Sequence, residues 1–156
     1  MSLPREVIYG ILFQYAQAAL GGPFKTISRE TVEVQRIPPS QQPVLFLDEA
    51  LEDFITGGVG LTSHKATIYF HVGCTSQKGT PAATILNPLL DALEAAFANG
   101  AADEAINALL VQQGYSSDDI ERVQFAGLAV KDLGQNSTDP EYRQAVAYVP
   151  FEIIYP

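Results

Sequence analysis

Residues 36–47 read Arg-Ile-Pro-Pro-Ser-Gln-Gln-Pro-Val-Leu-Phe-Leu, a proline-rich stretch that runs directly into an apolar segment. Proline fixes its own φ, removes a hydrogen-bond donor and drives the preceding residue toward extended backbone, so Ile37, Pro38 and Gln42 do not fit a helix. Residues 44–47 have the composition of a buried strand. The stretch therefore predicts a stiff, extended lead-in to a buried strand.

The sequence on either side of this stretch predicts a helix and further strands. Residues 4–20 carry apolar side chains near helical spacing and are followed by Gly21-Gly22-Pro23, which ends a helix. Residues 30–36 mix β-formers with charges and predict an exposed first strand. Apolar and polar residues alternate over 65–72, as in a strand with one apolar face. Residues 48–55 include four acids. They either continue the strand or turn briefly helical.

The second half of the chain predicts two helices and a β-hairpin. A leucine-rich stripe runs from Thr80-Pro81 to Asn99-Gly100 across Pro88, and we interpret it as one kinked helix. A shorter helix is expected over 103–113. Residues 123–133 and 143–155 are rich in strand formers, and the polar segment 134–140 between them is typical of a turn. Because this connection is longer than a usual hairpin loop, its tip is expected to extend as an arm.

Composition limits the class of protein. With 156 residues and 47% hydrophobic content, the chain is expected to form one domain over residues 1–156. The formal net charge is −9 and the nine Lys and Arg residues are scattered, which argues against specific nucleic-acid binding. A lone cysteine, no signal peptide and no apolar run near the ~20 residues of a membrane span predict a soluble cytoplasmic protein.

Few residues are candidates for catalysis or metal binding, and each also has a simpler structural interpretation. His71 and Cys74 have a metal-like spacing, but His64 alone does not complete a four-ligand shell. We expect His71 to face outward on its strand and Cys74 to act as a small apolar residue at its end.

The acidic run comprises Asp48, Glu49, Glu52 and Asp53. These residues could form a carboxylate pair for hydrolysis or bind a divalent ion, but such a run is more typical of a solvated face. Ser40, Ser63 and Ser76 lack the turn motif that exposes a nucleophile, and residues 57–60 lack the lysine of a phosphate loop. The sequence therefore predicts no catalytic, cofactor-binding or metal-binding residue.

The last strand is apolar on both faces. Along residues 145–154, both alternating sets of side chains are mainly apolar, and only Glu152 is charged. Such a strand must be covered on both sides. Helices of the same chain can cover one side, and either a neighbouring subunit or another layer of the same chain can cover the other.

Taken together, these segments resemble small minor tail proteins of long-tailed bacteriophages and prophages, the tail terminator or tail completion family. After the first helix, the resemblance is carried in order by residues 24–29, 37–47, 83–94 and 144–155, which read FKTISR, IPPSQQPVLFL, ATILNPLLDALE and QAVAYVPFEIIY. It covers most of the chain, but residues 100–120 depart from the pattern with a helix-like insertion.

The resemblance implies an α+β fold: a mostly antiparallel sheet of about four to five strands, two to three helices and a long C-terminal β-hairpin. It also implies a non-enzymatic structural protein that forms a ring, expected to be a hexamer, which caps the tail tube. The implied partners are the major tail tube protein and a head completion or connector protein, with no membrane. The implied location is the bacterial cytoplasm during assembly and then the virion tail.

Two alternatives from other classes remain. One is a small cytoplasmic hydrolase that uses the acidic residues near 48–53, with Asp48, Glu49 or His71 as candidates, which requires those groups to converge in a pocket. The other is a module that binds an extended peptide at an open sheet edge. The proline-rich stretch is expected to protect one such edge, which counts against the second alternative.

Overall fold

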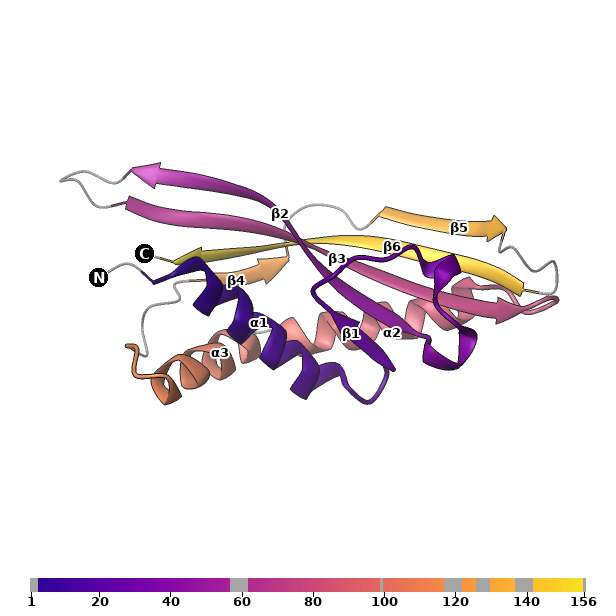
Figure 1. Ribbon diagram of the computed structural model, residues 1–156, viewed down its shortest axis with the longest axis horizontal. Helices are drawn as coiled ribbons and strands as arrows, with labels where there is room; N and C mark the ends of the chain where they lie inside the picture. Colours follow the sequence, from indigo (N-terminus) through magenta and orange to yellow (C-terminus); the bar gives the residue numbers. More distant parts are fainter. Residues whose placement is uncertain are drawn as a thin grey trace.

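The computed structural model describes residues 3–56, 62–98, 100–116, 122–125, 130–136 and 142–155. In these residues, three helices lie on one face of a six-stranded sheet (Figure 1). The elements are α1 (Arg5–Leu20), β1 (Thr26–Ser28), the short 3-10 helices η1 (Val34–Arg36) and η2 (Pro39–Gln41), β2 (Val44–Thr56), β3 (Thr62–Gln77), α2 (Ala83–Phe97), α3 (Ala101–Gln112), β4 (Arg122–Phe125), β5 (Val130–Asn136) and β6 (Tyr142–Tyr155). The arrangement confirms the predicted α+β fold.

The sheet is centred on the two long strands β3 and β6. Its order is β1-β2-β3-β6-β4, with β5 also paired to β6. Only β1 runs parallel to its neighbour; every other described pair is antiparallel. The predicted mainly antiparallel sheet is therefore confirmed, with one more strand than expected.

The C-terminal hairpin differs in detail from its prediction. The single strand predicted over residues 123–133 is two strands, β4 and β5, which pair with successive parts of β6. The antiparallel pairing of β5 with β6 confirms the hairpin itself. β5 also extends to Asn136, into the segment predicted as a turn. The rest of the predicted tip, residues 137–140, lies outside the described residues.

The helices follow the predicted stripes closely. In α2 the buried residues are spaced three and four apart, and the helix continues through Pro88 as predicted. The helix predicted over 103–113 is α3, which begins two residues earlier and ends one earlier. The helices cover the sheet face that carries the even-numbered residues of β3 from Ala66 to Cys74, all at most 1% exposed. An aromatic cluster of Phe70, Phe97 and Phe151 fills the centre of this core.

The first strand was predicted in the wrong place. Residues 30–36 do not form a strand: β1 lies earlier, and residues 34–36 form η1. The backbone bonds of this segment are local, since Arg36 N–H donates to Glu33 O and Ile37 N–H donates to Val34 O. The segment therefore joins no strand of the sheet. Residues 30–42, which we name the strap, instead cross the sheet face opposite the helices.

The strap is held by a close approach to Gly73 and by the side chain of Gln42. A Cβ atom added at Gly73 would lie 2.4 Å from Val34 Cγ2, so only glycine leaves room for the strap. The Gln42 amide donates to Val34 O at 3.3 Å and to Ile37 O at 2.9 Å, and Thr75 donates to Gln42 Oε1. The strap is thus tied to β3.

Beneath the strap lies a second apolar cluster. Val44, Phe46 and Val146 are at most 6% exposed, yet they do not belong to the core cluster under the helices. They alternate along β2 and β6 with residues of that core, so they face the strap. The chain's own strap therefore covers part of the second apolar face that the sequence predicted for the last strand.

The Gly73 contact predicts a mutational pattern. Gly73→Ala should lower the free energy of unfolding by about 1–3 kcal/mol, because the added methyl group overpacks the contact with Val34. When Val34 is also replaced by alanine, Gly73→Ala should lower the free energy of unfolding by less, because the two Val34 methyl groups that it would meet are gone. Chemical denaturation of the single and double variants measures this coupling.

The matched control for that experiment is Gly10→Ala in α1. A Cβ atom at Gly10 meets nothing within 4 Å. This substitution should be neutral or should stabilise the protein by up to about 1 kcal/mol, because alanine is the better helix former. The proposed contact would be contradicted if Gly73→Ala lowered the free energy of unfolding equally in the wild type and in the Val34→Ala variant.

Candidate functional site

The acidic run of β2 is divided between the two faces of the sheet. Asp48 pairs with Tyr69 across the ladder, whereas Glu52 pairs with Ala66, a residue of the helix-side core. The side chains of Asp48 and Glu52 therefore point to opposite faces, with a register shift between Glu49 and Leu51. This separation counts against a paired carboxylate site built from Asp48 and Glu52.

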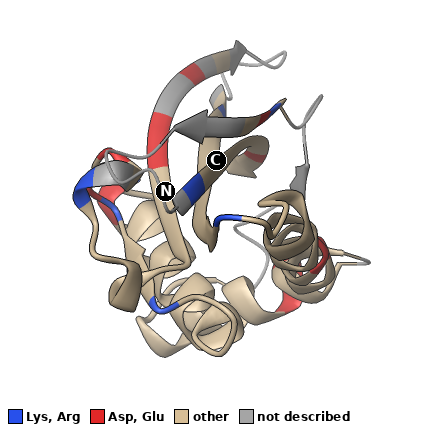
Figure 2. Cartoon of the chain, turned by 90° about the vertical axis from the view of Figure 1, so that its right-hand side faces the viewer, with Lys and Arg blue, Asp and Glu red and all other residues tan. Residues whose placement is uncertain are grey.

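Glu49 and Glu52 share the helix face, but each is bound to an arginine. Arg29 contacts Glu49 Oε1 at 2.5 Å and also pairs with Glu6 of α1. These exposed pairs tie α1 and the β1 region to β2, at a modest gain in stability. Figure 2 shows the other cations scattered over the chain rather than gathered on one face.

Glu52 is the centre of a network that joins four elements. Arg5 Nε donates to Glu52 Oε2 at 2.6 Å, and the Tyr155 hydroxyl donates to Oε1 at 2.6 Å. His64 Nδ1 lies 3.0 Å from Oε1, outside hydrogen-bond geometry, and its ring stacks on Tyr155 with centroids 5.0 Å apart. The exposed Phe54 ring packs edge-on against His64.

The network shifts the ionisation of its members. Burial opposes the ionised form of Glu52, but the hydrogen bonds from Tyr155 and Arg5 outweigh it and lower the pKa of Glu52. Burial, followed by the bond to Glu52, raises the pKa of Tyr155. The network is thus arranged to hold a charged carboxylate in place. Its contacts account for these shifts without a ligand.

His71 and Cys74 lie on opposite faces of β3. His71 Nε2 is 3.4 Å from Asp48 Oδ2, and its ring packs against Tyr148. Burial lowers the pKa of His71 despite the neighbouring carboxylate. Cys74 is buried in the helix-side core, and burial raises the pKa of its thiol to about 11. Cys74 is a buried apolar residue as predicted, although β3 continues past it to Gln77. His71 lies on the sheet face opposite the helices, but its side chain is only 19% exposed rather than open to solvent.

The described residues gather no three His, Cys, Asp or Glu side chains that could hold a metal ion. The glycine-rich residues 57–60 and the side chain of Asp53 lie outside the described part of the structure. That the chain has no catalytic, cofactor or metal residue stays a prediction.

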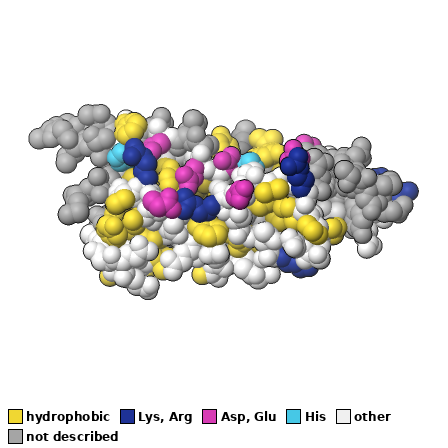
Figure 3. Space-filling view, viewed as in Figure 1, with side chains coloured by type: hydrophobic (Ala, Val, Ile, Leu, Met, Phe, Trp, Pro, Cys, Tyr) yellow, Lys and Arg dark blue, Asp and Glu magenta, His cyan; other side chains and the backbone are white. Residues whose placement is uncertain are grey.

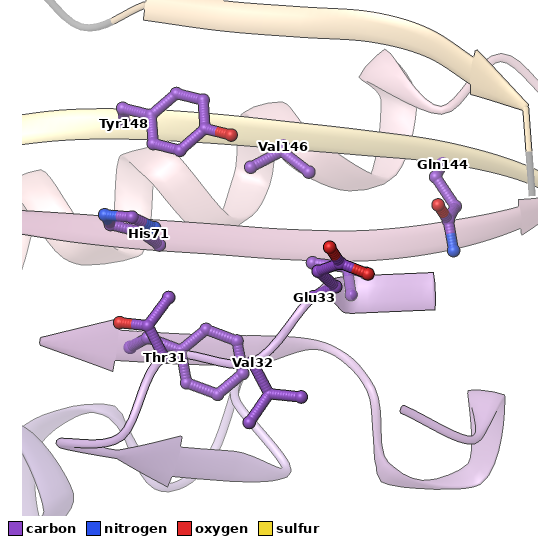
Figure 4. A pocket seen from close by; sticks show the side chains of 9 residues that line it. Thr31, Val32, Glu33, His71, Gln144, Val146 and Tyr148 are labelled. Atoms are coloured by element: carbon purple, nitrogen blue, oxygen red, sulfur yellow. The ribbon is translucent and has the colours of Figure 1, made fainter. Parts of the chain in front are cut away.

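One hollow opens on the sheet face opposite the helices, between the strap and β6 (Figure 4). It encloses about 390 Å³. Its lining residues come from the strap and from β2, β3 and β6: Thr31, Val32, Glu33, Val34, Phe46, His71, Gln144, Val146 and Tyr148. We name it the strap pocket. Sequence reasoning missed it because residues 30–36 were predicted as a strand, and no local signal marks a segment that crosses a sheet face.

Large apolar side chains are exposed near opposite ends of the long axis. Phe54 on β2 is 61% exposed, and Val130 and Leu133 on β5 are 59% and 50% exposed. β2 ends at one extremity of the molecule, whereas β5 lies toward the other (Figure 1). Leu133 also lines a shallow groove of about 500 Å³ with residues 79–83 and Arg143. In Figure 3, apolar side chains are interspersed with charged ones on the visible face.

Comparison with known proteins adds no family assignment: the chain matches no protein-family model and no curated protein sequence. Within the described residues, no helix is long and apolar enough to cross a membrane.

The Glu52 network predicts a pH dependence of stability. Because its pKa is lowered by folding, Glu52 stabilises the fold above its unfolded pKa, and this contribution is lost as the pH falls through the folded value. The free energy of unfolding should therefore drop between about pH 5 and pH 3, and Glu52→Gln should make the drop smaller. Denaturant titrations at several pH values measure both slopes.

Tyr155→Phe separates the hydrogen bond from ring packing, since it removes only the hydroxyl. The loss of a bond to a charged acceptor should cost about 1–3 kcal/mol at neutral pH. Tyr148→Phe is a suitable control on the same strand, because no hydroxyl bond of Tyr148 is seen among the described residues. Equal stability of the Tyr155 variant and the wild type would show that Glu52 does not depend on this bond.

Proposed function

We propose that this chain is a non-enzymatic assembly protein that associates with copies of itself into a ring, expected to be a hexamer, and caps a phage tail tube as tail terminators do. In this role the ring stops growth of the tube and offers a surface for joining the head. The partners are the major tail tube protein and a head completion or connector protein. The expected location is the bacterial cytoplasm during assembly and then the virion tail.

The observation that carries the proposal is the exposure of Phe54 at one end of the molecule and of Val130 and Leu133 toward the other. Large exposed apolar groups are a feature of protein-binding surfaces. Because the two surfaces differ, a contact between them is heterologous, and such a contact repeats around a closed ring when the rotation between subunits is correct. The resemblance of residues 37–47 and 144–155 to tail terminators supports the same role.

Two features of β2 and β6 fit a structural role for the resembling segments. Residues 144–155 lie within β6, which pairs with β3, β4 and β5. Residues 37–47 contain the end of the strap and the start of β2. These segments build the scaffold from which the exposed side chains project.

Peptide binding at a sheet edge is the second candidate. β5 lies at the edge of the sheet and pairs only with β6 among the described strands. An extended partner segment could add to such an edge through backbone hydrogen bonds. The strap does not protect this edge, because it lies across the sheet face rather than along β5, so the predicted protection by the proline-rich stretch does not apply here.

The test is the assembly state at high concentration, alone and with tail tubes. Electron microscopy and sedimentation velocity should show rings, and added protein should shorten growing tubes. Phe54→Ser and Leu133→Ser should each weaken ring formation at least about tenfold, because each removes an apolar anchor from one side of the contact.

Val111→Ser is the matched control, since Val111 is also 50% exposed but lies on α3 rather than on β2 or β5. It should assemble as the wild type does. A protein that stays monomeric at high concentration and leaves tube length unchanged would overturn the proposed function. A complex with one extended peptide at β5 and no ring would favour the second candidate.

A further inference from the structure

The strap pocket has an acidic surround and no Lys or Arg among its lining residues. Glu33 of the strap lines it directly. Asp48 lies beside the lining residue His71, with 3.4 Å between Oδ2 and Nε2. Asp132 of β5 stands opposite Val146 in the ladder, on the same face of the sheet as the pocket. Glu33 also makes an exposed ion pair with Arg36, at 3.3 Å.

Gln144 supplies an uncharged polar group to the pocket lining. Its side chain lines the pocket although the residue as a whole is only 4% exposed. Its amide is not among the fully buried polar atoms that lack a partner in the described residues, so it is not sealed off inside the core. The amide lies at one side of the pocket in Figure 4. A side-chain amide in the lining offers a ligand both an acceptor oxygen and N–H donors.

The rest of the pocket is apolar or carries uncharged hydroxyl groups. Phe46 and Val146 are buried in its floor, and Val32 and Val34 line the strap side. The Tyr148 ring lies over one side with its hydroxyl directed along the pocket (Figure 4). The volume of about 390 Å³ is within the range of small-ligand sites. An aliphatic chain fits this floor, and a polar head group fits the rim.

We propose that the strap pocket binds a cationic head group, an ammonium or guanidinium, carried on an aliphatic chain of about four or five carbons. The chain packs on Phe46 and Val146 through the hydrophobic effect. The head group donates hydrogen bonds to Gln144 Oε1 and to Glu33, and the surrounding carboxylates favour its charge. This chemistry belongs both to a Lys or Arg side chain of a partner protein and to free aliphatic diamines.

An anionic ligand is disfavoured by the same groups. No lining side chain carries a fixed positive charge, and burial lowers the pKa of His71, which keeps its imidazole neutral at pH 7. A purely apolar ligand would make no hydrogen bond to the Gln144 amide or to Glu33, both of which line the pocket. The inference does not depend on ring formation, because all the lining residues come from one chain.

The experiment is an NMR titration of dilute protein with three probes of equal length: pentylammonium, pentan-1-ol and pentanoate. The expected order of affinity is ammonium, then alcohol, then carboxylate, with the first at least about fivefold tighter than the second. Side-chain amide signals of Gln144 and methyl signals of Val34 and Val146 should shift together. Equal affinity for pentylammonium and pentan-1-ol, or shifts confined to other residues, would overturn the proposal.

Two variants assign the head-group contacts. Glu33→Gln should weaken pentylammonium binding about two- to fivefold, as expected for one partly exposed ion pair, and leave pentan-1-ol binding unchanged. Glu30→Gln removes the same charge three residues away, outside the lining, and should have a smaller effect. Gln144→Met keeps the chain length without the amide and should weaken binding of both probes. Wild-type affinity for pentylammonium in both Glu33→Gln and Gln144→Met would contradict the assigned contacts.

A final comparison distinguishes the two sources of the ligand. N-acetyl-lysine methylamide presents the ammonium from a peptide backbone, whereas 1,5-diaminopentane is a free diamine. Tighter binding of the lysine derivative supports a partner protein's side chain as the natural ligand. Tighter binding of the diamine supports a free amine. Binding of neither probe would overturn the proposal.

Discussion

The close approach of Val34 to Gly73 is the contact on which the outer face of the sheet depends. A side chain at position 73 would meet Val34 Cγ2 at 2.4 Å, so the strap could not lie where it does. The Gln42 amide then fixes the strap by bonding to Val34 O and Ile37 O. Without these contacts, Phe46 and Val146 would face water and the strap pocket would have no second wall.

The strap also explains why the proline-rich stretch matters. Pro38, Pro39 and Pro43 offer no backbone donor to a neighbouring strand, and each restricts the residue before it. Arg36 and Ile37 close local 3-10 bonds instead. The stretch was predicted to be a stiff lead-in to a buried strand, and Val44 is indeed fully buried at the start of β2. The crossing over the sheet face was not predicted.

Sequence reasoning worked where a pattern is local and failed where distant residues decide. The stripe of α2 and the alternation along β3 depend on one element at a time, and both are confirmed. Residues 30–36 carry the same β-forming residues as a strand, but Gly73, far away in sequence, decides that Val34 docks instead. The division of residues 123–133 into β4 and β5 also depends on pairing with β6, which propensity does not encode.

The polar clusters also could not be predicted from local sequence patterns. Arg5, Glu52, His64 and Tyr155 come from four elements, and only the fold brings them together. The acidic run looked like one solvated face, yet strand alternation sends Asp48 and Glu52 to opposite sides. Gln144 carries no motif at all. Its interest comes from its place in the lining of the strap pocket, which only the structure reveals.

These features lead to one account of the molecule: helices cover one face of the sheet, and the strap covers part of the other and creates a pocket there. The most direct test is the nuclear Overhauser effect between the Val34 methyl groups and the Gly73 α-protons in methyl-labelled protein. The account predicts a strong cross-peak between them. A missing cross-peak, with strand-type contacts between residues 30–36 and a neighbouring strand in its place, would contradict it.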